Sequence, residues 1–205
     1  MGTVTKNFSF NTNTTLPYTA EGGSWAAGAG NVSTTASINS GIDSTNDTNA
    51  GGGVLQMATS GKNKTSSNTW TWSGLWTDLG VPAGATVLTI NGNYDWWCTA
   101  FTTGSGDNTG TLTLLDGGGA LQATIISGTV AVSGTTTQAT RTGTAQNVPS
   151  GISASSASIE LQIQDVTSTG NSNSGACTIV HDWVALTITY ALSIPLLIMP
   201  PYIAS

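Results

Sequence analysis

The sequence predicts an all-β protein: an antiparallel, jelly-roll-like β-sandwich that ends in an extended apolar C-terminal arm. Three observations support this prediction. Apolar and polar residues alternate with a period of two in several segments, connectors rich in Gly, Asn and Ser separate these segments, and no stretch keeps the 3.6-residue period of a helix. Many strands joined by glycine-rich turns favour a sandwich over folds that mix strands with helices.

The first clearly predicted strand follows a less regular N-terminal part. Residues 1–53 contain few apolar anchors, so we expect long loops or edge strands there. The segment TWTWSGLW then places Trp70 and Trp72 on one face of a strand. The step from Ser73 to Gly74 predicts a bulge or bend before Leu75.

Four later segments alternate in the manner of half-buried antiparallel strands. Thr89, Asn91 and Asp95 are expected on the outer side of the first of them. The residues expected to face inward are Leu88, Ile90, Tyr94 and Trp96 in 85–98, Leu112 and Leu114 in 111–116, Ile159, Leu161 and Ile163 in 158–165, and Val184, Leu186, Ile188 and Tyr190 in 181–190. No repeat or linker divides the body, so we expect a single domain over residues 1–190 and an arm over 191–205.

Composition excludes one class of partner. Only 7% of the residues are charged, and ten acidic residues outnumber four basic ones. A surface that follows a phosphate backbone needs clustered Lys and Arg, so nucleic acid is not an expected partner. The N-terminal sequence MGTVTKNFSF lacks a basic stretch followed by an apolar one, so we expect synthesis without a signal peptide.

The titratable residues do not form a catalytic motif. His181 is the only histidine, and Asp182 follows it directly. Neighbours on a strand point to opposite faces, so these two side chains are not expected to form a dyad, and a structural role for His181 is favoured. A glycosidase-like carboxylate pair is a minority reading, which would draw on Asp95, Asp165, Asp182, Glu21 and Glu160. We therefore expect no enzyme and no cofactor.

Metal binding and disulfide formation have weak support. The stretch DSTNDTN offers Asp43, Asn46, Asp47 and Asn49 as oxygen ligands, but it departs from the EF-hand pattern, and an Asx-rich loop is favoured. Cys98 and Cys177 are the only cysteines, and without a signal peptide two buried thiols are expected, although a bridge is geometrically conceivable.

Two adjacent tryptophans are the candidate surface contacts. The alternation places Trp97 opposite Trp96, so one of the pair should face away from the core unless the strand bulges. An exposed indole is a common platform for stacking a sugar or anchoring a partner. Trp97 is the first candidate and Trp96 the second.

The C-terminal arm is the most unusual feature of the sequence. Three prolines, Pro195, Pro200 and Pro201, would break a membrane-spanning helix, so we expect no membrane span and an extended or polyproline-like segment. Left in water such a run favours aggregation, so we expect it to dock into a groove, on its own body or on a sister subunit. The arm residues expected to make these contacts are Ile194, Leu196, Leu197, Ile198, Met199, Tyr202 and Ile203.

A resemblance adds to this reading. The stretch WTWSGLWTDLGVPAGATVLTINGNYDWW, followed much later by HDWVALTITY, resembles the jelly-roll-like β-sandwich proteins on the virions of tailed bacteriophages, such as capsid decoration or cement proteins and small tail or fibre modules. The resemblance implies a non-enzymatic structural protein of the virion, a homo-oligomer that binds sister subunits and other virion proteins through its arm. The alternative is a glycan- or receptor-binding β-sandwich module of a tail fibre or cell surface.

Overall fold

The computed structural model describes residues 1–9, 18–20, 23–27, 36–38, 53–60, 65–102, 106–132, 139–168, 176–181 and 183–192. The arm residues from Ile194 to Ile203, the loop with Asp43 and Asp47, and Asp182 lie outside these ranges. In the described part no helix is long and apolar enough to cross a membrane.

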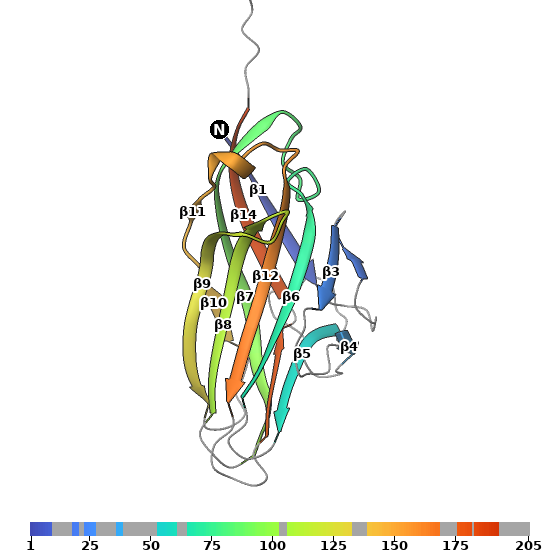
Figure 1. Cartoon of the computed structure of the whole chain (residues 1–205), viewed down its shortest axis with the longest axis vertical. Helices are drawn as coiled ribbons and strands as arrows, with labels where there is room; N and C mark the ends of the chain where they lie inside the picture. Colours follow the sequence, from blue (N-terminus) through green and yellow to red (C-terminus); the bar gives the residue numbers. More distant parts are fainter. Residues whose placement is uncertain are drawn as a thin grey trace, which may run out of the picture.

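Two antiparallel sheets pack face to face, which confirms the predicted all-β sandwich (Figure 1). The first sheet contains β1 (Gly2–Ser9), β14 (Trp183–Leu192), β7 (Ala85–Thr102), β13 (Ala176–His181), β5 (Gly53–Ser60), β4 (Ala36–Ile38), β10 (Ala139–Thr142) and β11 (Gln146–Asn147). The second sheet contains β2 (Tyr18–Ala20), β3 (Gly23–Ala27), β6 (Thr65–Leu75), β12 (Ser158–Ser168), β8 (Gly106–Asp116) and β9 (Leu121–Val132). A short 3-10 turn, η1 (Ser150–Ile152), precedes β12.

Strand β7 organises the first sheet. Its first half pairs with β14, from Ala85 to Tyr94, and its second half pairs with β13, from Trp97 to Thr102. Because β13 and β14 are separated only by residue 182, they run along β7 as one strand with a single interruption. The opposite edge of β7 carries β10 and β11.

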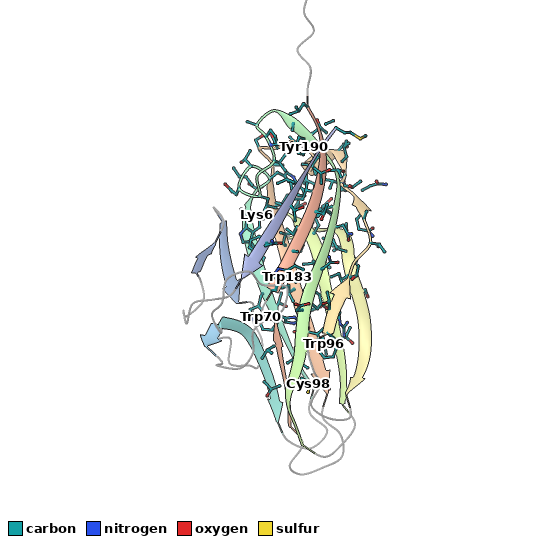
Figure 2. The ribbon with its side chains drawn as sticks, turned by 180° about the vertical axis from the view of Figure 1, so that it is seen from behind. Lys6, Trp70, Trp96, Cys98, Trp183 and Tyr190 are labelled. Atoms are coloured by element: carbon teal, nitrogen blue, oxygen red, sulfur yellow. The ribbon has the colours of Figure 1, made fainter. Side chains whose placement is uncertain are left out.

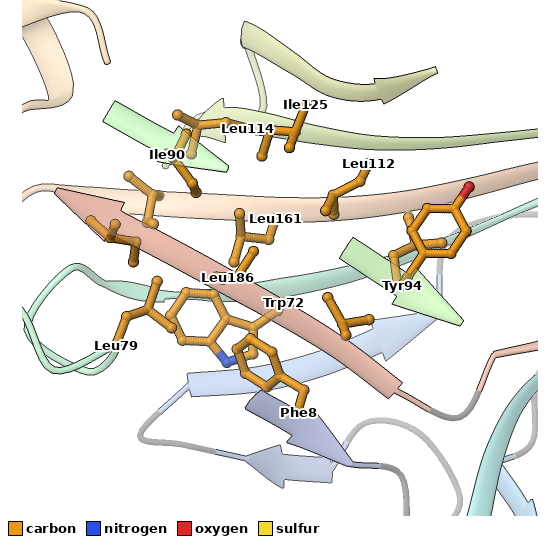
Figure 3. Close-up of a cluster of buried hydrophobic side chains, with 14 of the residues drawn as sticks. Phe8, Trp72, Leu79, Ile90, Tyr94, Leu112, Leu114, Ile125, Leu161 and Leu186 are labelled. Carbon is orange, nitrogen blue, oxygen red and sulfur yellow. The ribbon is translucent and has the colours of Figure 1, made fainter. Parts of the chain in front are cut away.

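The core lies between the sheets, and most of the predicted inward positions are confirmed. Trp70 and Trp72 are fully buried, as are the predicted leucines and isoleucines of β8 and β12. Figure 3 shows Trp72 with Leu112, Leu114 and Leu161 in this cluster. Phe8 from the first sheet meets Trp72 from the second with ring centroids 5.7 Å apart. Burying one such side chain contributes roughly 1.5–3 kcal/mol, so this alternation provides the main drive for the two sheets to pack.

Three positions differ from the prediction. The pairing of β7 with β14 shifts register between Thr189 and Tyr190, so Val87 takes the inward position and Leu88 is only half-buried. The bulge expected at Gly74 is absent, because β6 runs in unbroken register with β12 up to Leu75. Asp95, expected on the outer side, is fully buried.

Gly74 has a packing role in place of the expected bend. A Cβ on this residue would lie 2.5 Å from the ring of Trp72, which is closer than packed carbon atoms approach. The tryptophan ring therefore needs glycine two residues further along the same strand.

The segment after β10 closes one side of the sandwich. The amide of Gly143 donates to Gly92 O on β7 at 2.8 Å, and the amide of Thr144 donates to Ile125 O on β9 at 3.2 Å. This segment thus bonds to both sheets and covers part of β9, the last strand of the second sheet.

The edge strand β1 carries a charge on its inner face. Val4, Lys6 and Phe8 occupy the more buried alternate positions, whereas Thr3 and Thr5 are exposed (Figure 2). An inward-pointing lysine on an edge strand is a known way to discourage pairing with a strand from another chain.

Candidate functional site

The tryptophan pair predicted as a surface contact, Trp96 and Trp97, lies in β7. Figure 2 labels Trp96. Trp96 is only 4% exposed, and the Arg141 guanidinium stands 5.0 Å from the centre of its ring. Trp96 therefore occupies the inward position that the alternation predicts, and with Arg141 of β10 over its ring it is not an exposed contact. The side chains of Trp97 and Cys177 lie outside the described residues, whereas Cys98 is buried.

His181 forms a buried pair with Asp165 from the opposite sheet. Its Nε2 lies 2.5 Å from Asp165 Oδ2, and its Nδ1 lies 3.2 Å from the backbone oxygen of Asp95 on β7. The ring thus bonds to β7 where β13 ends and spans the core to β12. Sequence reasoning did not find this pair, because the two residues lie on strands of different sheets.

The hydrogen bonds limit how many protons this pair can hold. Because the carbonyl of Asp95 can only accept, Nδ1 of His181 must carry a proton. The short contact between Nε2 and Asp165 Oδ2 then requires one more proton between these two atoms. Whether that proton sits on nitrogen or oxygen, the pair as a whole is neutral, which suits its burial.

Tyr94 and Arg141 extend this buried polar cluster. The ring of Tyr94 meets His181 edge to face, with centroids 4.9 Å apart. Burial raises the pKa of the Tyr94 hydroxyl well above its usual value, and the negative charge of Asp165 raises it further, whereas nearby Arg141 lowers it. Arg141 Nη1 donates to Gly128 O on β9 at 2.9 Å, which gives a second polar link between the sheets.

A substrate cannot reach this cluster in the described structure. His181 is 1% exposed, and Asp95 and Asp165 are fully buried. The carboxylates of Asp95 and Asp165, considered from the sequence for glycoside hydrolysis, therefore belong to the core. Thr140 Oγ1 donates to Asp95 Oδ1 at 2.6 Å, so that carboxylate has a partner from β10.

A surface groove is the better candidate for a binding site. It has a volume of about 300 Å³ and lies at the end of the second sheet, between β6, β12 and the β8–β9 turn. Its lining consists of Ser73, Gly74, Leu75, Gly117, Ser158, Ile159 and Glu160. The sequence did not predict this groove, because its members come from three distant segments and match no motif.

The β8–β9 turn that borders the groove is held by Asp116. Its Oδ1 accepts hydrogen bonds from the amides of Gly118 at 2.9 Å and Ala120 at 3.0 Å. Gly119 has a φ of +83°, which favours glycine. A Cβ at Gly117 would lie 2.6 Å from Cβ of Ser158, so any side chain there would crowd the groove.

Glu160 is the only charged residue of the groove. Its carboxylate lies beside the turn, because a Cβ on Gly119 would stand 3.9 Å from Glu160 Oε2. The hydroxyls of Ser73 and Ser158 are exposed on either side, and Leu75 supplies an apolar wall. The groove thus combines an anionic acceptor, two hydroxyls and an apolar surface.

Beyond the groove, uncharged polar side chains continue along the outer face of the second sheet. Thr71, Gln162 and Thr113 stand side by side on β6, β12 and β8. Gln162 Nε2 donates to Thr71 Oγ1 at 3.4 Å. Thr69, Gln164 and Thr111 form the next row. This face offers hydroxyl and amide groups without charge.

Comparison with known proteins gives structural likeness only. No family model matches the chain, and no curated protein matches it. Among solved structures, an arabinose-bound α-L-arabinofuranosidase is 17% identical with a TM-score of 0.46, covering 88% of this chain and 25% of its own. The chain thus spans about a quarter of that protein.

Two further solved structures show a similar degree of structural likeness. The xylan-binding domain CBM22-1 of Paenibacillus barcinonensis Xyn10C is 16% identical with a TM-score of 0.42, covering 90% of this chain and 94% of its own. A structure of infectious bursal disease virus, Gt strain, is 17% identical with a TM-score of 0.36, covering 67% of this chain and 31% of its own. These matches concern β-sandwich architecture; the phage resemblance stays a prediction.

Proposed function

We propose that the chain is a non-enzymatic, glycan-binding β-sandwich module, and that the groove around Glu160 holds the sugar. The observation that carries this proposal is the lining of the groove. The carboxylate of Glu160 and the hydroxyls of Ser73 and Ser158 surround a space of about 300 Å³, which is within the usual size of small-ligand sites.

The chemistry of these groups suits a sugar. Sugar hydroxyls donate to a carboxylate and exchange hydrogen bonds with serine hydroxyls, while the C–H faces of the ring can pack on Leu75. A basic side chain is absent from the groove lining, so an acidic glycan has no charge partner there. A neutral glycan is therefore the preferred ligand.

Titration of the full chain with neutral oligosaccharides tests the proposal. Arabino-, xylo-, manno- and galacto-oligosaccharides form a suitable panel, and calorimetry with amide chemical-shift mapping gives both affinity and location. We expect shifts centred on residues 73–75, 117–119 and 158–160. Binding with shifts elsewhere, or no binding to any neutral glycan of a broad array, would refute this site.

Matched substitutions sharpen the test. Glu160→Gln keeps the size of the side chain and should weaken binding about ten- to hundredfold, because a hydrogen bond to a charged group contributes roughly 1.5–3 kcal/mol. Thr187→Ala is the control, since Thr187 is exposed on the outer face of the other sheet and should leave affinity unchanged. Equal affinities for all three proteins would exclude Glu160 as a ligand-binding residue.

A second candidate function is assembly in a virion, as a capsid decoration or cement protein. One observation favours it: Leu192, which is the last residue of β14 and the second residue of the predicted arm, is 57% exposed. In this proposal sister subunits or other virion proteins bind the arm through residues such as Leu196 and Ile198.

Light-scattering mass after size exclusion tests the arm. If it joins subunits, the full chain forms a defined oligomer, and replacing Leu196, Leu197 and Ile198 with Ser yields folded monomers. If both proteins are monomers and the substituted one unfolds at a lower temperature, the arm packs on its own body. The glycan-binding function then remains the sole proposal.

A further inference from the structure

The inner face of the second sheet has a hollow made by two glycines. Gly110 on β8 pairs directly with Gly128 on β9, and Asp165 on β12 pairs with Gly110 from the other side. The row Asp165–Gly110–Gly128 therefore lacks two side chains where its neighbours, such as Leu112 and Ile163, fill the core.

The polar groups of Tyr94 and Arg141, two side chains of the first sheet, lie in this hollow. A Cβ on Gly110 would lie 2.4 Å from Tyr94 Oη, 3.1 Å from Asp165 Oδ1 and 3.5 Å from Arg141 Nη1. A Cβ on Gly128 would lie 3.2 Å from Arg141 Nη1. The two glycines thus make room for the hydroxyl of Tyr94 and the guanidinium of Arg141.

Three polar atoms in this region are buried without a hydrogen bond of ordinary geometry. They are Tyr94 Oη, Asp165 Oδ1 and Arg141 Nη2, and the side chains of Tyr94 and Asp165 are fully buried. A buried polar atom without a partner costs roughly 1–3 kcal/mol, so three in one cluster would be a large penalty for a stable core. Such groups in proteins commonly share an internal water molecule.

We propose that one ordered water molecule binds beside the hollow, which the Tyr94 hydroxyl itself fills, and bridges Tyr94 Oη, Asp165 Oδ1 and Arg141 Nη2. The water accepts from Arg141 and donates to Asp165, and its remaining bond goes to the tyrosine hydroxyl, which can donate or accept. Together with the His181–Asp165 contact, this gives a continuous polar connection between the two sheets.

The charges around the hollow favour water over an ion. The Arg141 guanidinium opposes a cation, and the Asp165 carboxyl group opposes an anion. The wider surroundings include Asp95, which is bonded by Thr140, and His181, which shares its proton with Asp165. A neutral ligand with two donors and two acceptors satisfies all three atoms without adding charge.

A crystal structure of the full chain grown with bromide is the direct test. At a resolution of about 1.5 Å or better, we expect one density peak at hydrogen-bond distance, roughly 2.7–3.2 Å, from all three atoms, without anomalous signal. Direct bonds among the three atoms with no peak between them would overturn the proposal. An anomalous bromide peak would overturn it in favour of an anion site.

Magnetisation transfer from water in solution gives a second test that does not need crystals. The Gly110 amide should show a cross-peak to a long-lived water. This peak should be lost in Gly110→Ala, because the methyl group would lie 2.4 Å from Tyr94 Oη and displace that hydroxyl from the water. Gly151→Ala is the control, because nothing lies within 4 Å of its Cβ position. If Gly110→Ala does not fold, Tyr94→Phe takes its place in the test. It removes only the hydroxyl and should weaken the cross-peak. A cross-peak that persists in Tyr94→Phe at full strength would refute the bridge.

Discussion

His181 on β13 and Asp165 on β12 join the two sheets through a contact of 2.5 Å in the centre of the core. The pair is neutral as a unit, but each member alone would leave a buried polar or charged group behind. Removal of one partner should therefore be far more harmful than removal of both.

The first prediction follows from this asymmetry. Asp165→Leu should destabilise the fold by about 3–5 kcal/mol, because His181 then lacks its partner in the core. The double variant Asp165→Leu with His181→Leu should recover part of this loss. Urea unfolding of the four proteins in this cycle measures the coupling, and strictly additive effects would show that the pair does not act as a unit.

The second prediction concerns the tryptophan that needs a neighbouring glycine. Gly74→Ala places a methyl group 2.5 Å from the Trp72 ring, and overpacking of this kind typically costs about 1–3 kcal/mol. Gly151→Ala, whose Cβ position is open, is the matched control. Equal melting temperatures for the two variants would contradict the packing role of Gly74.

The third prediction is a dependence of stability on alkaline pH. Burial, with a smaller effect from Asp165, raises the pKa of Tyr94 above the value of about 10 that an unfolded tyrosine has. Above that pH the unfolded chain releases the proton while the folded chain keeps it, so the free energy of unfolding falls as pH rises. Below that pH this contribution is fully present.

Tyr94→Phe checks this assignment. Denaturant unfolding between neutral pH and strongly alkaline pH should show a smaller loss of stability in the variant than in the parent chain. Ultraviolet titration should also show one tyrosine of the parent that ionises only when the protein unfolds. A parent and a variant with parallel pH profiles would place the effect at another group.

The fourth prediction links the β8–β9 turn to the groove. Asp116→Ala removes an acceptor for the amides of Gly118 and Ala120, and loss of such a turn contact should cost about 0.5–1.5 kcal/mol. Because the turn borders the groove, the loss of glycan-binding free energy should be larger than the loss of unfolding free energy. Asp116→Asn keeps one acceptor oxygen and should retain most of both; equal losses in the two variants would point to charge instead.

The sequence predicted the sheets better than it predicted the sites. Alternation identified the core positions of β8, β12 and β14, since a one-sided core imposes a strict period of two. It failed at Leu88, because a register shift in β7 reverses the faces, and a shift of this kind leaves no sign in the local pattern. The sequence predicts a bend at Gly74, whereas the structure shows that this glycine makes room for the ring of Trp72, a contact that the local pattern does not reveal.

The sites depend on distant residues, which explains why the sequence did not show them. The pairing of His181 with Asp165 needs two strands from different sheets to face one another. In the sequence itself, the acidic residue beside His181 is Asp182. The groove likewise joins Ser73 to Glu160, whose proximity follows from the register of β6 against β12. Local patterns carry no information on such registers.

Lys6 gives the chain a property that its composition alone would not. Only four basic residues are present, and one of them occupies the inner face of β1, the outermost strand beside β14. A foreign strand that paired there would press this ammonium group against its own apolar residues. The β1 edge of the first sheet is therefore a poor template for strand addition by a neighbouring copy of the protein.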